Sequence, residues 1–174
     1  MDKETIKKEL VERHDSFVNF LLKLSEPEFS QSKNDKWTAG QQLEHIYLSV
    51  KPLRQVLSLP KGMLQIVFGS SNRESKDYEA LVKKYTAILE NGGRASTRFT
   101  PKKGHFEKRQ KLKNALAKEV GSLCSKIDKF SEKDLDTYVL PHPLLGKLTI
   151  REMLYFTMYH VDHHYAITNR NLNV

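Results

Sequence analysis

Residues 149–170, TIREMLYFTMYHVDHHYAITNR, give the clearest helix signal in the chain. Thr149 and Glu152 have the spacing of a capping box, in which each side chain accepts a hydrogen bond from a free backbone N–H of the first turn. At about 100° per residue, one helix face then carries a stripe of apolar and histidine side chains: Met153, Phe156, Thr157, His160, His164 and Ile167. We therefore predict a helix from this cap to about Arg170, with the stripe turned towards a core.

The rest of the chain is also predicted to be mostly helical. Apolar spacings of three, four and seven, together with capping residues, predict helices at residues 2–24, 38–57, 77–90 and 105–130. Within the long connection that follows the second of these, residues 63–68 are expected to form a helical turn or a packed loop. Pro141 and Pro143 exclude a regular helix around them, and no segment is persuasive as a strand. The predicted fold class is all-α, a helical bundle.

Length and composition predict one domain spanning residues 1–174, because no Ser/Gly-rich or Pro-rich linker divides the chain. The longest apolar run, residues 63–68, is far too short to cross a bilayer. The first residues contain no apolar signal segment, which predicts a cytoplasmic protein. A single cysteine, Cys124, excludes an internal disulfide and a cysteine-based zinc cluster.

The formal net charge is +8, and most of the excess lies in one segment. Residues 101–118 hold seven Lys or Arg residues and one Glu, a net of +6. Such a segment is typical of a solvated helix face, and a nucleic-acid-binding surface is the alternative. No groove-reading motif accompanies it, so the solvated face is favoured.

Histidines on the last predicted helix are the main candidates for chemistry. His160 and His164 are four residues apart and therefore share a face, which gives two metal ligands at a suitable separation. His160 and His163 form an alternative pair, and ordinary hydrogen-bonded core histidines remain a further interpretation. The pattern does not match His-Glu-x-x-His metalloproteases, because Val161 follows His160.

A third ligand must come from elsewhere in the chain, and the residues alone leave it open. The candidates are a carboxylate or another histidine: His14, His45, His105 and His142. His45 lies about 110° from the centre of the apolar stripe of its predicted helix, whereas His14 is better aligned with an apolar stripe.

Three motifs occur along the chain: Trp37-Thr38-x-x-Gln41-x-x-x-His45, Pro141-His142-Pro143-Leu144-Leu145-Gly146-Lys147-Leu148-Thr149 and His160-x-x-His163-His164. Together they resemble the DinB-like (YfiT-like, bacillithiol transferase-like) superfamily, and the resemblance covers nearly the whole chain. It implies a four-helix bundle with an up-down-down-up course and extra short helices in the connections.

The resemblance also implies a metal site made by His45, His160 and His164, with His163 as a neighbour that is not a ligand. Members of the superfamily often have Gln shortly after the histidine pair, whereas Tyr165 to Asn169 follow here. Three histidines leave open positions on a divalent ion, the arrangement of catalytic sites. Zinc, nickel and iron all suit imidazole ligands.

The function implied by the resemblance is that of a metal-dependent enzyme. It would be a low-molecular-weight-thiol S-transferase of the detoxifying kind, or a related hydrolase, whose partners are a small-molecule thiol and an electrophile. The superfamily also implies a homodimer. The alternative is a non-catalytic stress-response or nucleic-acid-binding helical module that uses residues 101–118.

Overall fold

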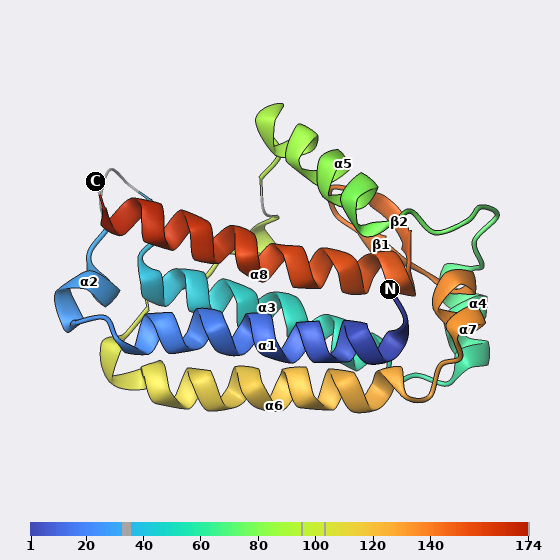
Figure 1. Cartoon of the computed structure of the whole chain (residues 1–174), viewed down its shortest axis with the longest axis horizontal. Coiled ribbons are helices and arrows are strands. Elements are labelled where there is room, and N and C mark those ends of the chain that lie inside the picture. The colour runs from blue at the N-terminus through green and yellow to red at the C-terminus, as the bar shows by residue number, and fades with distance from the viewer. Residues whose placement is uncertain (33–35, 95, 103, 174) are drawn as a thin grey trace.

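The computed structural model describes residues 1–32, 36–94, 96–102 and 104–173, and most of them are helical. The longest helices lie alongside one another (Figure 1): α1 (Lys3–Leu22), α3 (Ala39–Val56), α6 (Arg109–Ile127) and α8 (Ile150–Leu172). In Figure 1, α1 and α8 run in one direction and α3 and α6 in the other. Both α1 and α3 contact α6 and α8. The all-α fold class is confirmed.

Shorter helices fill the connections between the long ones, as expected: α2 (Glu26–Ser30), α4 (Lys61–Phe68), α5 (Tyr78–Glu90), α7 (Glu132–Thr137) and the 3-10 turns η1 (Thr97–Phe99) and η2 (Phe106–Lys108). Of the two structures expected for residues 63–68, a helical turn or a packed loop, α4 confirms the helical one. Helix α5 packs on α8 and projects away from the long helices (Figure 1). The chain between α5 and α6 returns across the start of α3, where the backbone of Gly104 lies against that of Gly40.

Capping side chains fix where the helices begin. The capping box predicted at Thr149 is present before α8, and a second capping box lies at Thr38 before α3. Asp77 and Ser131 cap α5 and α7 in the same way, each accepting a hydrogen bond from a first-turn N–H. Helix α3 continues through Pro52.

The expectation that the chain contains no strand is wrong. Strands β1 (Val139–His142) and β2 (Gly146–Thr149) form an antiparallel hairpin before α8. A two-stranded hairpin tolerates its prolines because both strands are edges. Gly146 has φ 78°, a left-handed conformation that glycine adopts without strain. The Nδ1 atom of His142 accepts hydrogen bonds from two turn N–H groups, those of Leu144 and Leu145.

The core lies between the long helices and is made of their apolar stripes. Fully buried members include Phe17, Leu43, Leu123 and Leu154, one from each long helix. No helix in the described part of the chain combines the length and apolar character that a membrane span requires.

Candidate metal centre

Three buried histidines from two helices meet between α3 and α8. The Nε2 atom of His160 lies 3.1 Å from Nε2 of His45 and 3.0 Å from Nε2 of His164. The three side chains offer one ligand atom each, and these atoms all lie within 4.8 Å of one another. Each residue is less than 8% exposed. The structure thus brings together the three histidines that the family resemblance implied.

The other ring nitrogen of two of these histidines is held by an oxygen. His45 Nδ1 lies 2.7 Å from the carbonyl oxygen of Phe99, and His164 Nδ1 lies 2.5 Å from Oε1 of Gln42. Both oxygens only accept hydrogen bonds, so each Nδ1 carries the proton. In a neutral imidazole the Nε2 atom then presents a lone pair, as metal-ligating histidines do.

Hydrogen bonds alone cannot satisfy this group. The lone pairs of His45 and His164 both face Nε2 of His160, which carries at most one proton and can donate to one of them. A lone pair is therefore left facing another nitrogen in a buried site. A divalent cation between the rings accepts all three lone pairs, so the donor set fits a metal ion.

Burial keeps the three imidazoles in the neutral form that binds metal. It lowers the pKa of His45, and it lowers the pKa values of His160 and His164 well below the ordinary histidine value. Neighbouring imidazoles add to the effect on His160 and His164, because two adjacent positive charges are unfavourable. At neutral pH protons therefore compete little with a cation.

Aromatic side chains enclose the histidines. The ring of Trp37 lies 5.0 Å from that of His45 and stacks on His164 at 6.3 Å, centroid to centroid. Phe156 stacks on His160 at 4.8 Å. These apolar walls exclude water from the ligand nitrogens on two sides, which strengthens electrostatic interactions at the site.

Periodicity had not favoured His45, and helix packing explains why it is nevertheless buried. Helix α3 contacts α6 as well as α8, so it buries two faces. Gln42 and His45, three residues apart, form the face that meets the histidines of α8.

Two other histidines that were candidates for the third ligand lie outside the group. His14 is buried on α1 with Nδ1 against the carbonyl oxygen of Leu10. His105 is half exposed and lies 3.5 Å from the carboxylate of Glu107.

The remaining histidines are neighbours of the centre. The imidazole of His142 closes the hairpin turn and packs against Phe156. His163 is half-buried, with its ring 5.3 Å from that of His164 and 6.0 Å from that of Tyr85. The alternative pair of His160 and His163 is not the one brought together.

Sequence reasoning missed the groups that orient the ligands. Gln42 carried a detectable signal, because a polar residue three positions before His45 shares its helix face. The Phe99 carbonyl carried none, since it is a backbone atom from a distant turn. Trp37 directly precedes the cap of α3, and its contact with His164 depends on how α8 packs.

Replacing Gln42 by Leu is expected to weaken metal binding about 10- to 100-fold, because the His164 imidazole loses the acceptor that fixes its tautomer. Competition with a chelator of known affinity measures the change. Gln55→Leu is the matched control, since Gln55 is exposed on the same helix. Equal affinity in both variants would contradict this role for Gln42.

None of the described residues of the basic segment belongs to the three-histidine group. Its described residues form the chain before α6 and the first half of that helix, which packs on α1 and α3. Lys103 lies outside the described residues.

Fold and site together define a class: a predominantly helical protein whose long helices enclose three histidines able to hold a metal ion. The model of the DinB superfamily matches residues 9–168. The chain therefore belongs to the DinB superfamily. A search of curated proteins found no match.

Proposed function

We propose that this protein is a metal-dependent enzyme whose divalent ion is held by His45, His160 and His164. The observation that carries the proposal is that three buried Nε2 atoms converge on one point. Hydrogen bonds among these three nitrogens cannot pair all of their lone pairs, whereas a bound cation can. Zinc, nickel and iron all suit a set of three imidazoles.

When bound, the ion supplies a Lewis acid that lowers the pKa of a water or thiol at an open position. The chain's own residues prepare that position. Gln42 and the Phe99 carbonyl hold two imidazoles with Nε2 inward. Trp37 and Phe156 keep bulk water from the ligand nitrogens.

The reaction we propose is transfer of a small-molecule thiol to an electrophile. The thiol loses its proton to solvent, its sulfur forms a bond to the electrophilic carbon, and the leaving group departs with its electron pair. Superfamily membership and the neutral three-histidine donor set support this reaction. A related hydrolase would use water in place of the thiol.

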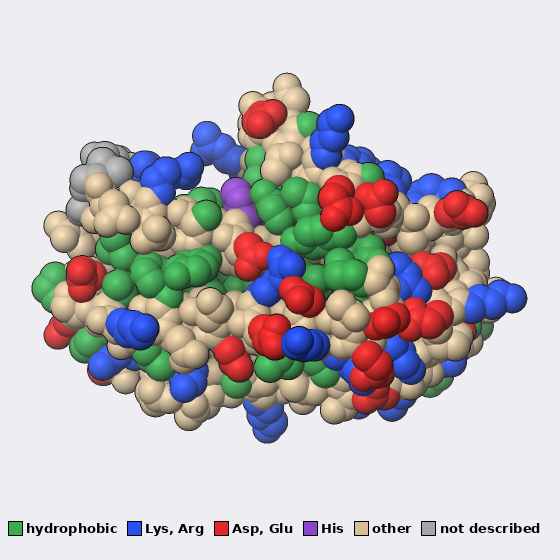
Figure 2. All heavy atoms as spheres, in the orientation of Figure 1, with side chains coloured by type: hydrophobic (Ala, Val, Ile, Leu, Met, Phe, Trp, Pro, Cys, Tyr) green, Lys and Arg blue, Asp and Glu red, His purple; other side chains and the backbone are tan. Residues whose placement is uncertain are grey.

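Positive charge beside the centre supports an anionic co-substrate. Exposed Lys36 precedes Trp37, and exposed Arg98 precedes Phe99. Burial and then the nearby charge of Arg170 lower the pKa of His163. Figure 2 shows Lys and Arg side chains along the edge between α5 and the C-terminal end of α8, near a histidine that reaches this face.

We further propose that the long helices form the four-helix bundle of up-down-down-up course that the resemblance implies. Their contacts and directions support this topology (Figure 1). Pairing into a homodimer and a cytoplasmic location stay predictions.

The reaction is tested by loading the protein with zinc, nickel or iron and supplying thiols, glutathione among them, with a chlorinated aromatic electrophile. We expect S-aryl product and chloride in equal amounts, and neither from metal-stripped protein. Full metal content without turnover of any thiol would contradict the transferase. Nucleic-acid binding that falls steeply with salt would then favour the non-catalytic module.

A further inference from the structure

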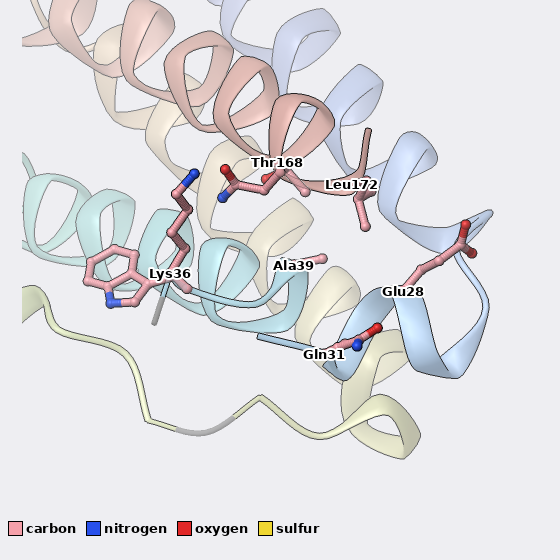
Figure 3. A pocket seen from close by; sticks show the side chains of 8 residues that line it. Glu28, Gln31, Lys36, Ala39, Thr168 and Leu172 are labelled. Atoms are coloured by element: carbon pink, nitrogen blue, oxygen red, sulfur yellow. The ribbon is translucent and has the colours of Figure 1, made fainter. Parts of the chain in front are cut away.

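A pocket lies at the end of the helices next to the metal centre. It is a hollow of about 80 Å³ between the C-terminal end of α8, helix α2 and the chain that enters α3 (Figure 3). That volume holds a functional group the size of an amide or a carboxylate, because one water needs about 10–15 Å³ on the same measure. Trp37 and Thr168 line it, so the pocket and the three-histidine group share a wall.

One polar side chain that lines the pocket has no hydrogen-bond partner in the part of the chain that the structure describes. Both the nitrogen and the oxygen of the Asn171 carboxamide are buried and make no hydrogen bond within the described residues. Buried polar groups are almost always paired, so such an exception points to a missing partner. A carboxamide pairs best with a group that offers a donor and an acceptor on the same side, and one residue of an extended peptide-like chain does so with its N–H and C=O.

Charged side chains lie at the rim of the same pocket. Figure 3 shows the Lys36 side chain extending from the chain before α3 towards the C-terminal end of α8. Lys36 is exposed, and its flexible stem can move aside to admit a ligand. Its ammonium group would pair with a carboxylate, whereas Glu28 on the opposite side of the pocket would face an amino group.

The pocket continues the face of α8 that carries the metal ligands. His160, His164, Thr168 and Asn171 follow one another at intervals of four, four and three, which keeps them on one side of the helix. The rise of 1.5 Å per residue places Asn171 about 10 Å along the axis from His164. A small extended molecule is therefore long enough to span the distance between the metal centre and Asn171.

We infer that this pocket binds the amide and carboxylate end of a small peptide-like molecule, with Asn171 as its recognition residue and Lys36 as its counter-ion. Its role as a substrate subsite rests on the proposed function, because the reacting atom would lie at the three histidines. The ability of the pocket to bind an amide does not depend on the proposed function, and it is measured separately.

The probe is S-methylglutathione, which carries amides and carboxylates but no free thiol. Trp37 is the single tryptophan, so its fluorescence reports occupancy of the pocket that it lines. We expect a saturable change on titration of the full chain at fixed metal content. Asn171→Leu should weaken binding at least about tenfold, the cost of leaving one amide unpaired.

Asn169→Leu is the matched control, since Asn169 is exposed two residues earlier on α8. It should bind as the parent does. S-methylcysteamine, which lacks both the amide and the carboxylate, should produce no saturable change. Absence of saturation with S-methylglutathione, or equal affinity in the Asn171 variant, would overturn the inference. Saturable binding by a protein that takes up no metal would keep the pocket and refute the proposed function.

Discussion

Replacing His160 by Ala is expected to abolish metal binding. His160 is the residue that both other Nε2 atoms face, so its removal leaves His45 and His164 without the third imidazole of the proposed site. Two imidazoles hold a divalent ion far more weakly than three. Loss of a residue that only orients a ligand lowers metal affinity by about 10- to 100-fold, so we expect loss of His160 to lower it by more than about 100-fold. Elemental analysis of protein purified without a His tag should show close to one ion per chain in the parent and a trace in the variant.

The adjacent His163 provides the control for this experiment. It is half-buried beside the centre, but the three-histidine group does not include it. His163→Ala should therefore keep its metal, which separates loss of a ligand from disturbance of α8. Circular dichroism must show both variants to be helical. A parent protein that takes up neither zinc, nickel nor iron would refute the metal centre.

Replacing Glu152 by Ala is expected to destabilise the fold by about 3 kcal/mol. Its carboxylate is fully buried and pairs with the guanidinium of Arg73 at 2.6 and 2.8 Å. It also accepts hydrogen bonds from the backbone N–H groups of Lys76 and Thr149. Removing one partner of such a pair leaves the others without an acceptor. The expected loss of stability lies at the lower end of the range for broken buried ion pairs, because the Arg73 side chain is 38% exposed. Urea unfolding measures it.

A surface glutamate shows what an ordinary ion pair contributes. Glu12 lies 3.8 Å from Lys8, and both side chains are exposed. Glu12→Ala should change the free energy of unfolding by no more than about 0.5 kcal/mol. A similar small change in Glu152→Ala would show that the buried carboxylate does not hold the start of α8 and the preceding chain together.

The Glu152 contribution should also depend on pH in a defined direction. Burial raises the pKa of its carboxyl, but the hydrogen bonds and the charge of Arg73 outweigh burial and lower it. The ionised form therefore stabilises the fold above the ordinary glutamate pKa of about 4.3, and this stability is lost as pH falls through the lower value. The difference in stability between the parent and Glu152→Gln should narrow in that acidic range. A difference that is unchanged there would contradict the assignment.

Local signals predicted much of the helical structure. Apolar periodicity and capping residues act within a few residues of one another, so the helix starts predicted near residues 38, 77 and 149 are confirmed by the caps at Thr38, Asp77 and Thr149. The hairpin before α8 was not predicted, because its strands are short and stabilise one another only when paired.

Part of the site was also visible in the sequence. Residues four apart on a helix must share a face, so His160 and His164 were predicted as a pair before any fold was known. Periodicity did not predict the third histidine, His45, because whether its face of α3 is buried depends on how many helices pack against α3. The resemblance supplied His45, and the structure places it against the pair.

The sequence by itself determined the longer helices, the starts of those with capping residues, the histidine pair and the family resemblance, because these follow from residues near one another along the chain and from its motifs. The tertiary structure places His45 against that pair, as the resemblance implied. It alone decided that Gln42 and the Phe99 carbonyl fix the protons of His164 and His45, and that the Asn171 carboxamide has no hydrogen-bond partner among the described residues. Each of these features joins residues more than 50 positions apart or depends on which neighbours surround a buried atom. Periodicity has no information about such contacts, since the packing of α3 on α8 creates them.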